Sequence, residues 1–86
     1  MANGTLLIER IVSVGHASPP GFWYDQEWDE WVKVLQGEAC LELGDGRTVE
    51  LAAGEHLLIP RGLRHRVERT SQDPSCLWLA VHWGRG

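Results

Sequence analysis

The chain alternates between short apolar runs and clusters of glycine, proline and small polar residues. The apolar runs are rich in Val, Leu, Ile and Trp. None shows the 3.6-residue periodicity of apolar positions over a stretch long enough to predict a helix. Turn signals separate the runs, among them Pro19-Pro20-Gly21, Gly37-Glu38 and Gly44-Asp45-Gly46. Short strands at regular spacing predict an all-β fold, an antiparallel sandwich or barrel.

About six to eight strands are expected from these runs. The dipeptide Gln36-Gly37 joins two of them in a hairpin, and Gly44-Asp45-Gly46 makes a second tight turn. The first segment is either one strand or two short ones. The predicted strands are Thr5–Val14, Glu30–Leu35, Ala39–Leu43, Arg47–Leu51, His56–Ile59, His65–Arg69 and Leu77–Trp83.

The segment Cys76–Trp83 is apolar on both of its alternating faces. Leu77 and Val81 fall on one face, and Trp78 and Ala80 fall on the other. A strand with one solvated face would alternate polar and apolar residues. We therefore expect the core on one side and a second subunit, or a packed hairpin, on the other. A domain this short is marginally stable alone, which also favours a homodimer with paired or swapped N-terminal strands.

Composition narrows the class of protein. The 86 residues are expected to form one domain, residues 1–86, and the formal charge of -4 disfavours nucleic acid and anionic membranes as partners. No run approaches the roughly 20 apolar residues of a membrane span, and Met1–Arg10 lacks the pattern of a signal peptide. Cys40 and Cys76 have no metal or redox spacing, so we expect reduced thiols and a cytoplasmic location.

Two motifs with fixed internal spacing stand on the predicted strands and turns. In the first, Glu30 is separated by six residues from Gly37. In the second, the fixed positions are Gly54, Pro60, Gly62 and His65. Together they resemble the cupin family, in which two such motifs frame one metal site. The resemblance implies a small antiparallel cupin β-barrel or jelly roll, with motif one at about 22–37 and motif two at about 54–69.

The chain departs from the cupin pattern at the metal ligands. Cupins with a full metal site usually begin motif one with His-x-His. Those two positions fall here on Tyr24 and Gln26 or, with the other usual spacing, on Trp23 and Asp25. Motif two usually ends with Asn, and that position is Arg69. Half of the usual ligands are therefore absent.

The ligands that the resemblance carries over are Glu30 and His65. Gln26 lies four residues before Glu30, so strand alternation would place both side chains on the same face. Asp25 is a stronger donor but needs a bulge or loop to aim it inward. His82 on the last strand would complete a His-His-carboxylate set. Such a set suits a divalent transition metal, namely Fe, Mn, Ni or Zn, with positions left open for a small-molecule ligand.

Two metal-free alternatives remain open. Strand alternation places Arg69 on the same inward face as His65, so Glu30 and His65 would pair with each other or with Arg69 in a buried polar network. Alternatively, a binding or sensor module would hold a small anionic ligand in an aromatic pocket formed by Tyr24, Trp23, His65 and Arg69.

The resemblance implies a metal-dependent dioxygenase or isomerase if the chain is an enzyme, acting on a small organic acid or polyphenol. A third hypothesis is a dimeric accessory protein whose barrel is filled by side chains. His16 and His56 are predicted to be surface histidines, and Trp78 is expected to pack in the core. For Trp28, as for Trp23, the sequence leaves two alternatives: the side chain packs in the fold, or it lines the mouth of the pocket.

Overall fold

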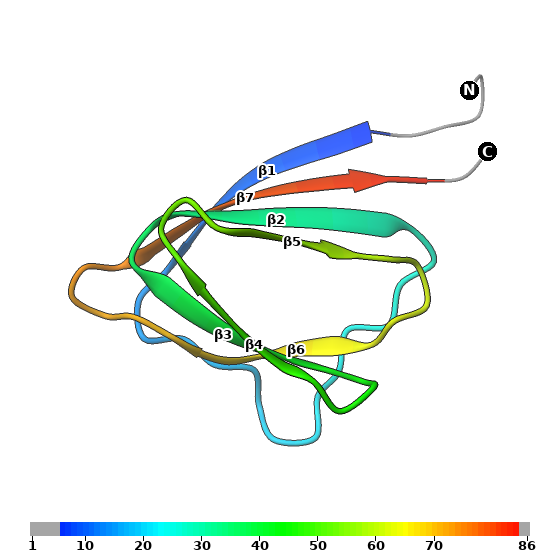
Figure 1. The fold of residues 1–86 in the computed structure, drawn as a ribbon, viewed down its shortest axis with the longest axis horizontal. Helices are drawn as coiled ribbons and strands as arrows, with labels where there is room; N and C mark the ends of the chain where they lie inside the picture. The colour runs from blue at the N-terminus through cyan, green and yellow to red at the C-terminus, as the bar shows by residue number, and fades with distance from the viewer. Residues whose placement is uncertain (1–5, 85–86) are drawn as a thin grey trace.

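A computed structural model describes residues 6–84 as two antiparallel sheets that face each other (Figure 1). The four-stranded sheet has the order β1-β7-β2-β5, and the three-stranded sheet has the order β4-β3-β6. Residues 6–84 contain no helix that could cross a membrane. The strands are β1 (Leu6–Ser13), β2 (Asp29–Gln36), β3 (Glu38–Leu43), β4 (Thr48–Ala52), β5 (His56–Ile59), β6 (His65–Thr70) and β7 (Cys76–Trp83).

The all-β antiparallel fold expected from the turn pattern is confirmed. The hairpin β2–β3 turns at Gly37, and each later strand lies within about two residues of its predicted bounds. The first predicted segment forms the single strand β1, and Thr5 lies outside the described residues. Because β7 pairs with both β1 and β2, the first and last described strands lie side by side in one sheet, as in a jelly roll.

The hydrophobic core occupies part of the space between the two sheets. Val34, Leu41 and Ile59 are almost fully buried there, together with Cys76. Burial raises the pKa of the Cys76 thiol to about 11. Trp78 packs in the same core, as predicted, and its indole Nε1 donates a hydrogen bond to Ser13 Oγ at 3.2 Å. The buried indole therefore has its polar atom satisfied.

A β-bulge interrupts β6 and decides which of its side chains face inward. Leu41 pairs with Val67, but the preceding residue of β3, Cys40, pairs with Arg69. One extra residue, Glu68, is therefore inserted in β6 opposite this step. The insertion reverses the alternation, so that Val67 faces the space between the sheets and Arg69 faces solvent.

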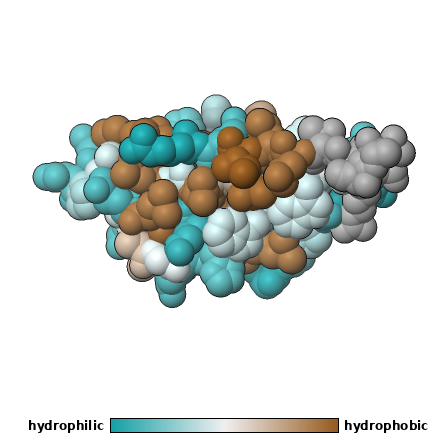
Figure 2. Space-filling model, turned by 90° about the horizontal axis from the view of Figure 1, so that it is seen from above, coloured by the Kyte–Doolittle hydropathy of each residue, from teal (hydrophilic) through white to brown (hydrophobic). Residues whose placement is uncertain are grey.

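The outer face of the four-stranded sheet is not covered by any other described strand (Figure 1). Figure 2 looks down on the molecule from the side of β1 and β7, and apolar side chains gather across the surface in this view. The sheet thus has the core on its inner face and exposed apolar groups on its outer face.

Candidate functional site

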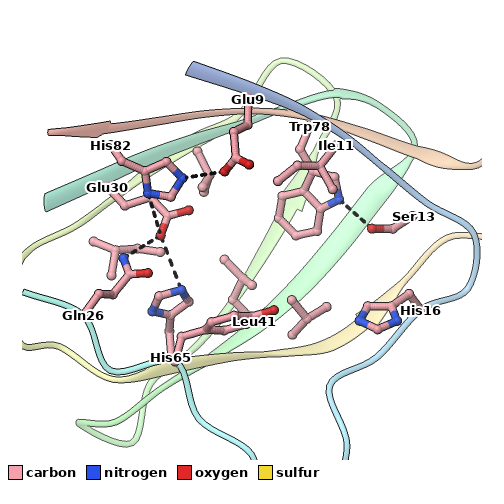
Figure 3. A pocket seen from close by; sticks show the side chains of 14 residues that line it. Glu9, Ile11, Ser13, His16, Gln26, Glu30, Leu41, His65, Trp78 and His82 are labelled. Carbon is pink, nitrogen blue, oxygen red and sulfur yellow. Dashed lines mark hydrogen bonds and ion pairs between the residues drawn. The ribbon is translucent and has the colours of Figure 1, made fainter. Parts of the chain in front are cut away.

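A cavity of about 250 Å³ lies between the two sheets (Figure 3). Its apolar wall comes from both sheets and consists of Ile11, Val32, Leu41, Ile59, Val67 and Trp78. Its polar lining consists of Glu9, Ser13, His16, Tyr24, Gln26, Glu30, His65 and His82. Such a cavity, mostly apolar with a few convergent polar groups, is the usual form of a small-molecule site.

Five of the lining side chains gather at one end of the cavity, and we call them the polar cluster: Glu9, Gln26, Glu30, His65 and His82 (Figure 3). Cross-strand pairing explains why they meet. Glu30 of β2 lies directly opposite His82 of β7, and the inner face of β1 brings Glu9 beside that pair. His65 enters from the other sheet as the first residue of β6.

The loop before β2 is tied to β6 next to the cluster. The backbone N–H of Tyr24 donates to the His65 carbonyl at 2.7 Å, and the His65 N–H donates to the Tyr24 carbonyl at 3.1 Å. The two rings stack with their centroids 5.2 Å apart. Further along the loop, the Gly62 N–H donates to the carbonyl of Gln26 at 3.0 Å. The loop therefore holds Gln26 beside the start of β2.

The carboxylate of Glu30 is the centre of the cluster. The residue is 7% exposed, and its Oε1 accepts a hydrogen bond from Gln26 Nε2 at 2.8 Å. The same oxygen lies 3.6 Å from His65 Nε2 and 3.8 Å from His82 Nδ1. Both separations are longer than a hydrogen bond. One carboxylate oxygen therefore faces two imidazole nitrogens without bonding to either.

His65 is held in its neutral form by its surroundings. Burial lowers the pKa of its imidazole below the ordinary value, and the charge of Glu30 only partly opposes that effect. A hydrogen bond with the backbone of Leu63 also opposes the lowering of this pKa in part. Nε2 faces Glu30 Oε1 at 3.6 Å without a hydrogen bond among the described residues, so this nitrogen is available to a ligand in the cavity (Figure 3).

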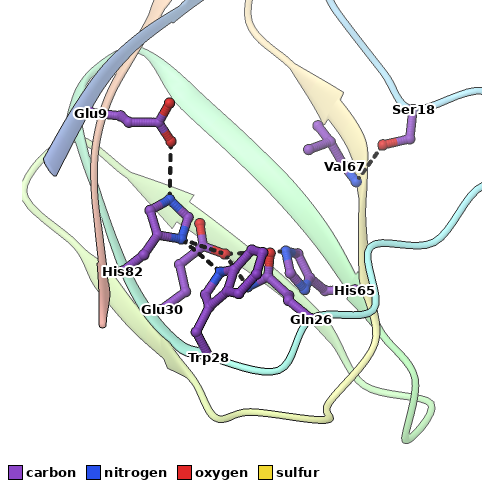
Figure 4. Close-up of polar contacts among 8 residues, drawn as sticks. All are labelled: Glu9, Ser18, Gln26, Trp28, Glu30, His65, Val67 and His82. Carbon is purple, nitrogen blue, oxygen red and sulfur yellow. Dashed lines mark hydrogen bonds and ion pairs between the residues drawn. The ribbon is translucent and has the colours of Figure 1, made fainter. Parts of the chain in front are cut away.

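The hydrogen bonds of His82 fix its tautomer (Figure 4). The indole Nε1 of Trp28 can only donate, and it lies 3.1 Å from His82 Nδ1, so that nitrogen must be the acceptor. The proton of the ring is therefore on Nε2, which donates to Glu9 Oε1 at 3.0 Å. The lone pair of Nδ1 is on the side of the ring that faces Glu30.

The lowered pKa of His65 predicts a loss of stability in mild acid. Below the unfolded-state value of about 6.5, the unfolded chain takes up a proton that the folded chain refuses. The free energy of unfolding of the metal-free protein should therefore fall as the pH drops from about 6.5 toward the folded-state pKa, and be fully retained above 6.5.

Urea unfolding in the presence of a chelator, at several pH values between about 5 and 8, measures this dependence. The variant His65→Gln should show a flatter slope than the wild type. His56→Gln, at an exposed histidine on β5, should keep the wild-type slope. Equal slopes in all three proteins would show that His65 does not titrate as described.

The charge on the cavity lining is one-sided. Two carboxylates, Glu9 and Glu30, line the cavity, whereas none of its lining residues is Lys or Arg. The three lining histidines carry charge only if protonated. A buried carboxylate without a cation is costly, so the cavity favours a positively charged or metal-balanced occupant over a bare anion.

The structure brings together most of the predicted ligand set. Gln26, Glu30, His65 and His82 all line the cavity, and Tyr24 lines it beside His65. The predicted pairing of Glu30 with His65 is present as a 3.6 Å approach rather than a hydrogen bond. These positions agree with strand alternation as read from the sequence.

The predicted inward position of Arg69 is wrong. The bulge at Glu68 turns Arg69 outward, where its side chain is 49% exposed and pairs with Glu38 and Glu50 at 3.4 and 3.2 Å. Counting alternate residues from His65 had predicted an inward Arg69. The prediction failed because a bulge leaves no clear sign in the sequence. Arg69 therefore does not line the cavity. The positively charged side chain that was expected to bind an anionic ligand is absent from the cavity lining.

Asp25 and Trp23 also lie away from the cavity lining. Asp25 is exposed, and no bulge turns it inward. Trp23 instead stacks under the guanidinium of Arg64, 5.3 Å from the ring centroid, which is a surface cation–π contact. The His-x-His positions had two possible alignments with this chain. The residues of one alignment, Tyr24 and Gln26, line the cavity, and those of the other do not.

Three residues have roles that the sequence did not reveal. His16 is exposed, as predicted, but it also lines the cavity at the end away from Glu30 (Figure 3). Glu9 and Trp28 bond to the two nitrogens of His82. The one available signal for Glu9 was an acid in a largely apolar first strand, between Ile8 and Arg10. Glu9 meets His82 because β1 lies next to β7, and the sequence pattern does not determine the order of strands in a sheet.

These features define a class of protein: a small two-sheet antiparallel barrel with a cavity between the sheets and a carboxylate–imidazole cluster on β2, β6 and β7. A family model described as the Cupin domain matches residues 10–82, which is most of the chain. The chain therefore belongs to the Cupin domain family.

Solved structures show the same fold. A proposed mannose-6-phosphate isomerase of Ralstonia eutropha JMP134 is 48% identical, with a TM-score of 0.87, covering 93% of this chain and 75% of that one. A cupin superfamily protein of Desulfitobacterium hafniense is 16% identical, with a TM-score of 0.73 and 95% and 68% covered. Iron(II) HppE in complex with substrate is 17% identical, with a TM-score of 0.65 and 93% and 45% covered. Curated proteins gave no significant match.

Proposed function

We propose that this cupin binds one divalent transition metal ion through Glu30, His65 and His82 and presents it to a small organic molecule in the cavity. One observation carries the proposal. The carboxylate of Glu30 is buried, its hydrogen-bond donor among the described side chains is the neutral amide of Gln26, and the cavity lining has no Lys or Arg. A buried carboxylate in such surroundings needs a cation.

The donor set fits the chemistry of such an ion. A carboxylate and two neutral imidazoles are ligands that Fe, Mn, Ni and Zn accept. Donors that share an ion at about 2.1 Å lie roughly 3.0–3.5 Å apart, close to the 3.6 and 3.8 Å between Glu30 Oε1 and the two ring nitrogens. Among the described residues, no three His, Cys, Asp or Glu side chains are already grouped as a metal site. Binding would thus require small side-chain movements.

The chain's own contacts indicate what those movements are. His82 Nδ1 would exchange the indole N–H of Trp28 for the ion, while Glu9 keeps the ring oriented through Nε2. A carboxylate on the far nitrogen of a ligating histidine is the common supporting contact of metal sites. A bound ion would offset the charges of Glu9 and Glu30 and polarise an oxygen atom of the organic molecule.

The relatives indicate which reactions to assay first. The 48% identity to a proposed mannose-6-phosphate isomerase makes isomerisation of a sugar the first candidate reaction. A phosphate group usually needs Arg or Lys, and the cavity lining has neither. We therefore propose that unphosphorylated sugars and other neutral molecules with adjacent oxygen atoms suit the cavity better than sugar phosphates. The location proposed for this activity is the cytoplasm.

Metal content tests the proposal directly. Untagged protein, incubated with Fe, Mn, Ni or Zn salts and desalted, is expected to retain about one ion per chain by plasma mass spectrometry. His65→Ala should reduce that ratio to less than about a tenth, since a ligand is lost. His56→Ala removes a histidine outside the cavity and should retain the wild-type ratio. Stoichiometric metal in His65→Ala, or none in the wild type, would reject the site.

A second candidate is a metal-free binding module. The observation in its favour is that much of the cluster is already internally bonded, through Gln26–Glu30 and through Trp28–His82–Glu9. Under that hypothesis the cavity binds a neutral or cationic molecule against its apolar wall. Binding of the same molecule with equal affinity before and after chelation would favour this candidate over the first.

A further inference from the structure

The cavity is polar at both ends and apolar between them (Figure 3). On the inner face of β1, three lining residues follow one another two positions apart: Glu9, Ile11 and Ser13. Glu9 belongs to the polar cluster, and Ser13 lies four residues further along the strand, about 13 Å away at the usual rise. β6 repeats the change from polar to apolar with His65 and then Val67. The cavity thus has a second polar end, at Ser13.

The second polar end is completed by the segment 14–18, which follows β1 and which we call the strap. Thr70 Oγ1 on β6 donates a hydrogen bond to the carbonyl of His16 at 2.7 Å. The Ser18 N–H donates to the Val67 carbonyl at 2.8 Å, and the Val67 N–H donates in return to Ser18 Oγ at 3.0 Å. These bonds hold the strap against β6 without using the ring of His16. The imidazole is therefore kept at this end of the cavity with both of its nitrogens unused.

Two hydrogen-bond donors at this end lack an acceptor among the described residues. Ser13 Oγ accepts the indole N–H of Trp78, which leaves its own O–H proton unpaired in a residue that is 8% exposed. The imidazole of His16 makes no hydrogen bond to any described residue. One of its nitrogens carries a proton in either neutral tautomer. A buried donor without an acceptor costs free energy, so an acceptor atom placed between Ser13 and His16 would satisfy both groups.

The size of the cavity limits the ligand to a single ring. A volume of about 250 Å³ is below the roughly 300–1,000 Å³ of sites for drug-sized molecules. One ring with a polar substituent at each end matches the distance of about 13 Å along β1, once its contacts at both ends are included. A ligand of this size therefore contacts both polar ends at once.

The middle of the cavity decides what kind of ring fits. Both sheets contribute apolar side chains there, among them Ile11 and Trp78 from one sheet and Leu41 and Val67 from the other. A sugar ring carries hydroxyl groups around its edge, and most of them would lose water without gaining a hydrogen bond. An aromatic ring buries apolar faces against these side chains and packs favourably against the indole of Trp78. For binding, the middle of the cavity therefore favours an aromatic ring over a sugar.

We propose that Ser13 and His16 form a second binding point for the ligand, which is a neutral aromatic molecule with adjacent oxygen atoms at one end and a hydrogen-bond acceptor at the other. The adjacent oxygens lie toward Glu30, and the acceptor lies between Ser13 and His16. The position of the adjacent oxygens rests on the proposed function, because that end of the cavity holds the proposed metal site. The second binding point rests on the far end of the cavity alone.

Isothermal titration of the zinc-loaded full chain with two probes tests the second binding point. Protocatechualdehyde has adjacent hydroxyls at one end and an aldehyde oxygen at the other, and in its methyl analogue a methyl group replaces the aldehyde. Zinc has no redox chemistry and leaves both probes unoxidised. His16→Leu should weaken binding of the aldehyde at least about fivefold and binding of the methyl analogue less than about twofold. The aldehyde also makes the hydroxyls more acidic, but equally in both proteins, so the difference between the two losses isolates the far end.

Two further variants serve as controls. His16→Gln keeps a side-chain donor and should recover most of the affinity for the aldehyde. His56→Leu removes an exposed histidine outside the cavity and should leave both affinities unchanged. Because Thr70 bonds to the backbone of His16, the His16 variants should keep the strap in place, and circular dichroism checks that they are folded.

The zinc content of each sample keeps this proposal apart from the proposed function. His16→Leu should retain as much zinc per chain as the wild type, since His16 is not a proposed ligand. With zinc bound, four outcomes would each overturn the proposal: no binding of either probe, equal losses for both, no loss for either, or tighter binding of unphosphorylated mannose than of the aldehyde. Absence of zinc from the wild type would count against the metal site alone, and the same comparison on the metal-free protein would then decide the second binding point.

Discussion

Glu30→Gln is expected to stabilise the metal-free protein while removing its ability to bind metal. The substitution keeps the shape of the side chain and can keep the contact with Gln26, because an amide oxygen also accepts its hydrogen bond. What it removes is a negative charge at a residue only 7% exposed, in a cavity without Lys or Arg. Neutralising a buried charge that lacks a cation should raise the free energy of unfolding by about 1–3 kcal/mol.

Metal binding should change in the opposite direction. An amide is a weak neutral donor, and the proposed site would lose the one carboxylate among its three ligands. Loss of a supporting contact alone costs about 10–100-fold in metal affinity, so loss of a ligand should cost at least about 100-fold. Isothermal titration with the metal that the wild type retains measures the affinity, and urea unfolding with chelator measures the stability.

A matched control separates burial from charge. Glu50→Gln makes the same chemical change at a side chain that is 74% exposed and paired with Arg69 on the surface. It should change stability by less than about 0.5 kcal/mol and leave metal affinity unaltered. If Glu30→Gln destabilises the protein, the negative charge of Glu30 is already balanced by its surroundings, and the predicted gain in stability is wrong. If it binds metal like the wild type, Glu30 is not a ligand.

The two effects together define a site in which function opposes stability. A filled apolar barrel would have no reason to bury Glu30, His65 and His82 against one another. Polar groups held in this way at a cost to the fold are typical of binding and catalytic sites. A gain in stability combined with a loss of binding would therefore support a functional role for the cluster over a purely structural one.

Sequence patterns were sufficient to predict the fold and four of the five residues of the polar cluster, Gln26, Glu30, His65 and His82. Alternation along β2 and β6 places Glu30 and His65 inward, and the fixed spacing to Gly37 and Pro60 places both strands correctly. Each of these inferences uses a regular, local repeat, since successive side chains in a strand point to opposite faces. Local regularity is what a single sequence expresses most clearly.

The errors arise where the backbone is irregular or the contact is distant. Arg69 lies outward because one inserted residue in β6 reverses the alternation. The contacts of Glu9 and Trp28 with His82 join residues 73 and 54 positions apart in the chain. They depend on β7 lying between β1 and β2, a strand order that apolar patterning leaves undetermined.

Gly37→Ala is the substitution expected to damage the fold most. Gly37 turns the β2–β3 hairpin with φ at 77°, a conformation that residues with a side chain rarely adopt. A Cβ at this position would collide with Ser71 Oγ, lie 2.8 Å from the Ser75 carbonyl oxygen and lie 3.1 Å from Cys76 Cα. Two of these obstacles are backbone atoms, of Ser75 just before β7 and of Cys76 at its start, so rotating a side chain cannot relieve them.

The expected cost combines backbone strain with overpacking. The left-handed backbone costs an alanine about 1–2 kcal/mol, and overpacking costs about 1–3 kcal/mol more. The sum, about 2–5 kcal/mol, is a large share of the roughly 5–10 kcal/mol that stabilises a domain of this size. Urea unfolding should show a much lower midpoint, or the variant should fail to fold.

Gly46→Ala is the control that isolates the crowding. Gly46 has φ at 95° in the β3–β4 turn, but a Cβ there meets no atom within 4 Å. It should cost about 1–2 kcal/mol from backbone strain alone and remain folded. Equal losses in the two variants would mean that contact with β7 is unimportant. A larger loss at Gly37 would show that this motif-one glycine lets the hairpin pack closely against the start of β7, the strand that carries His82.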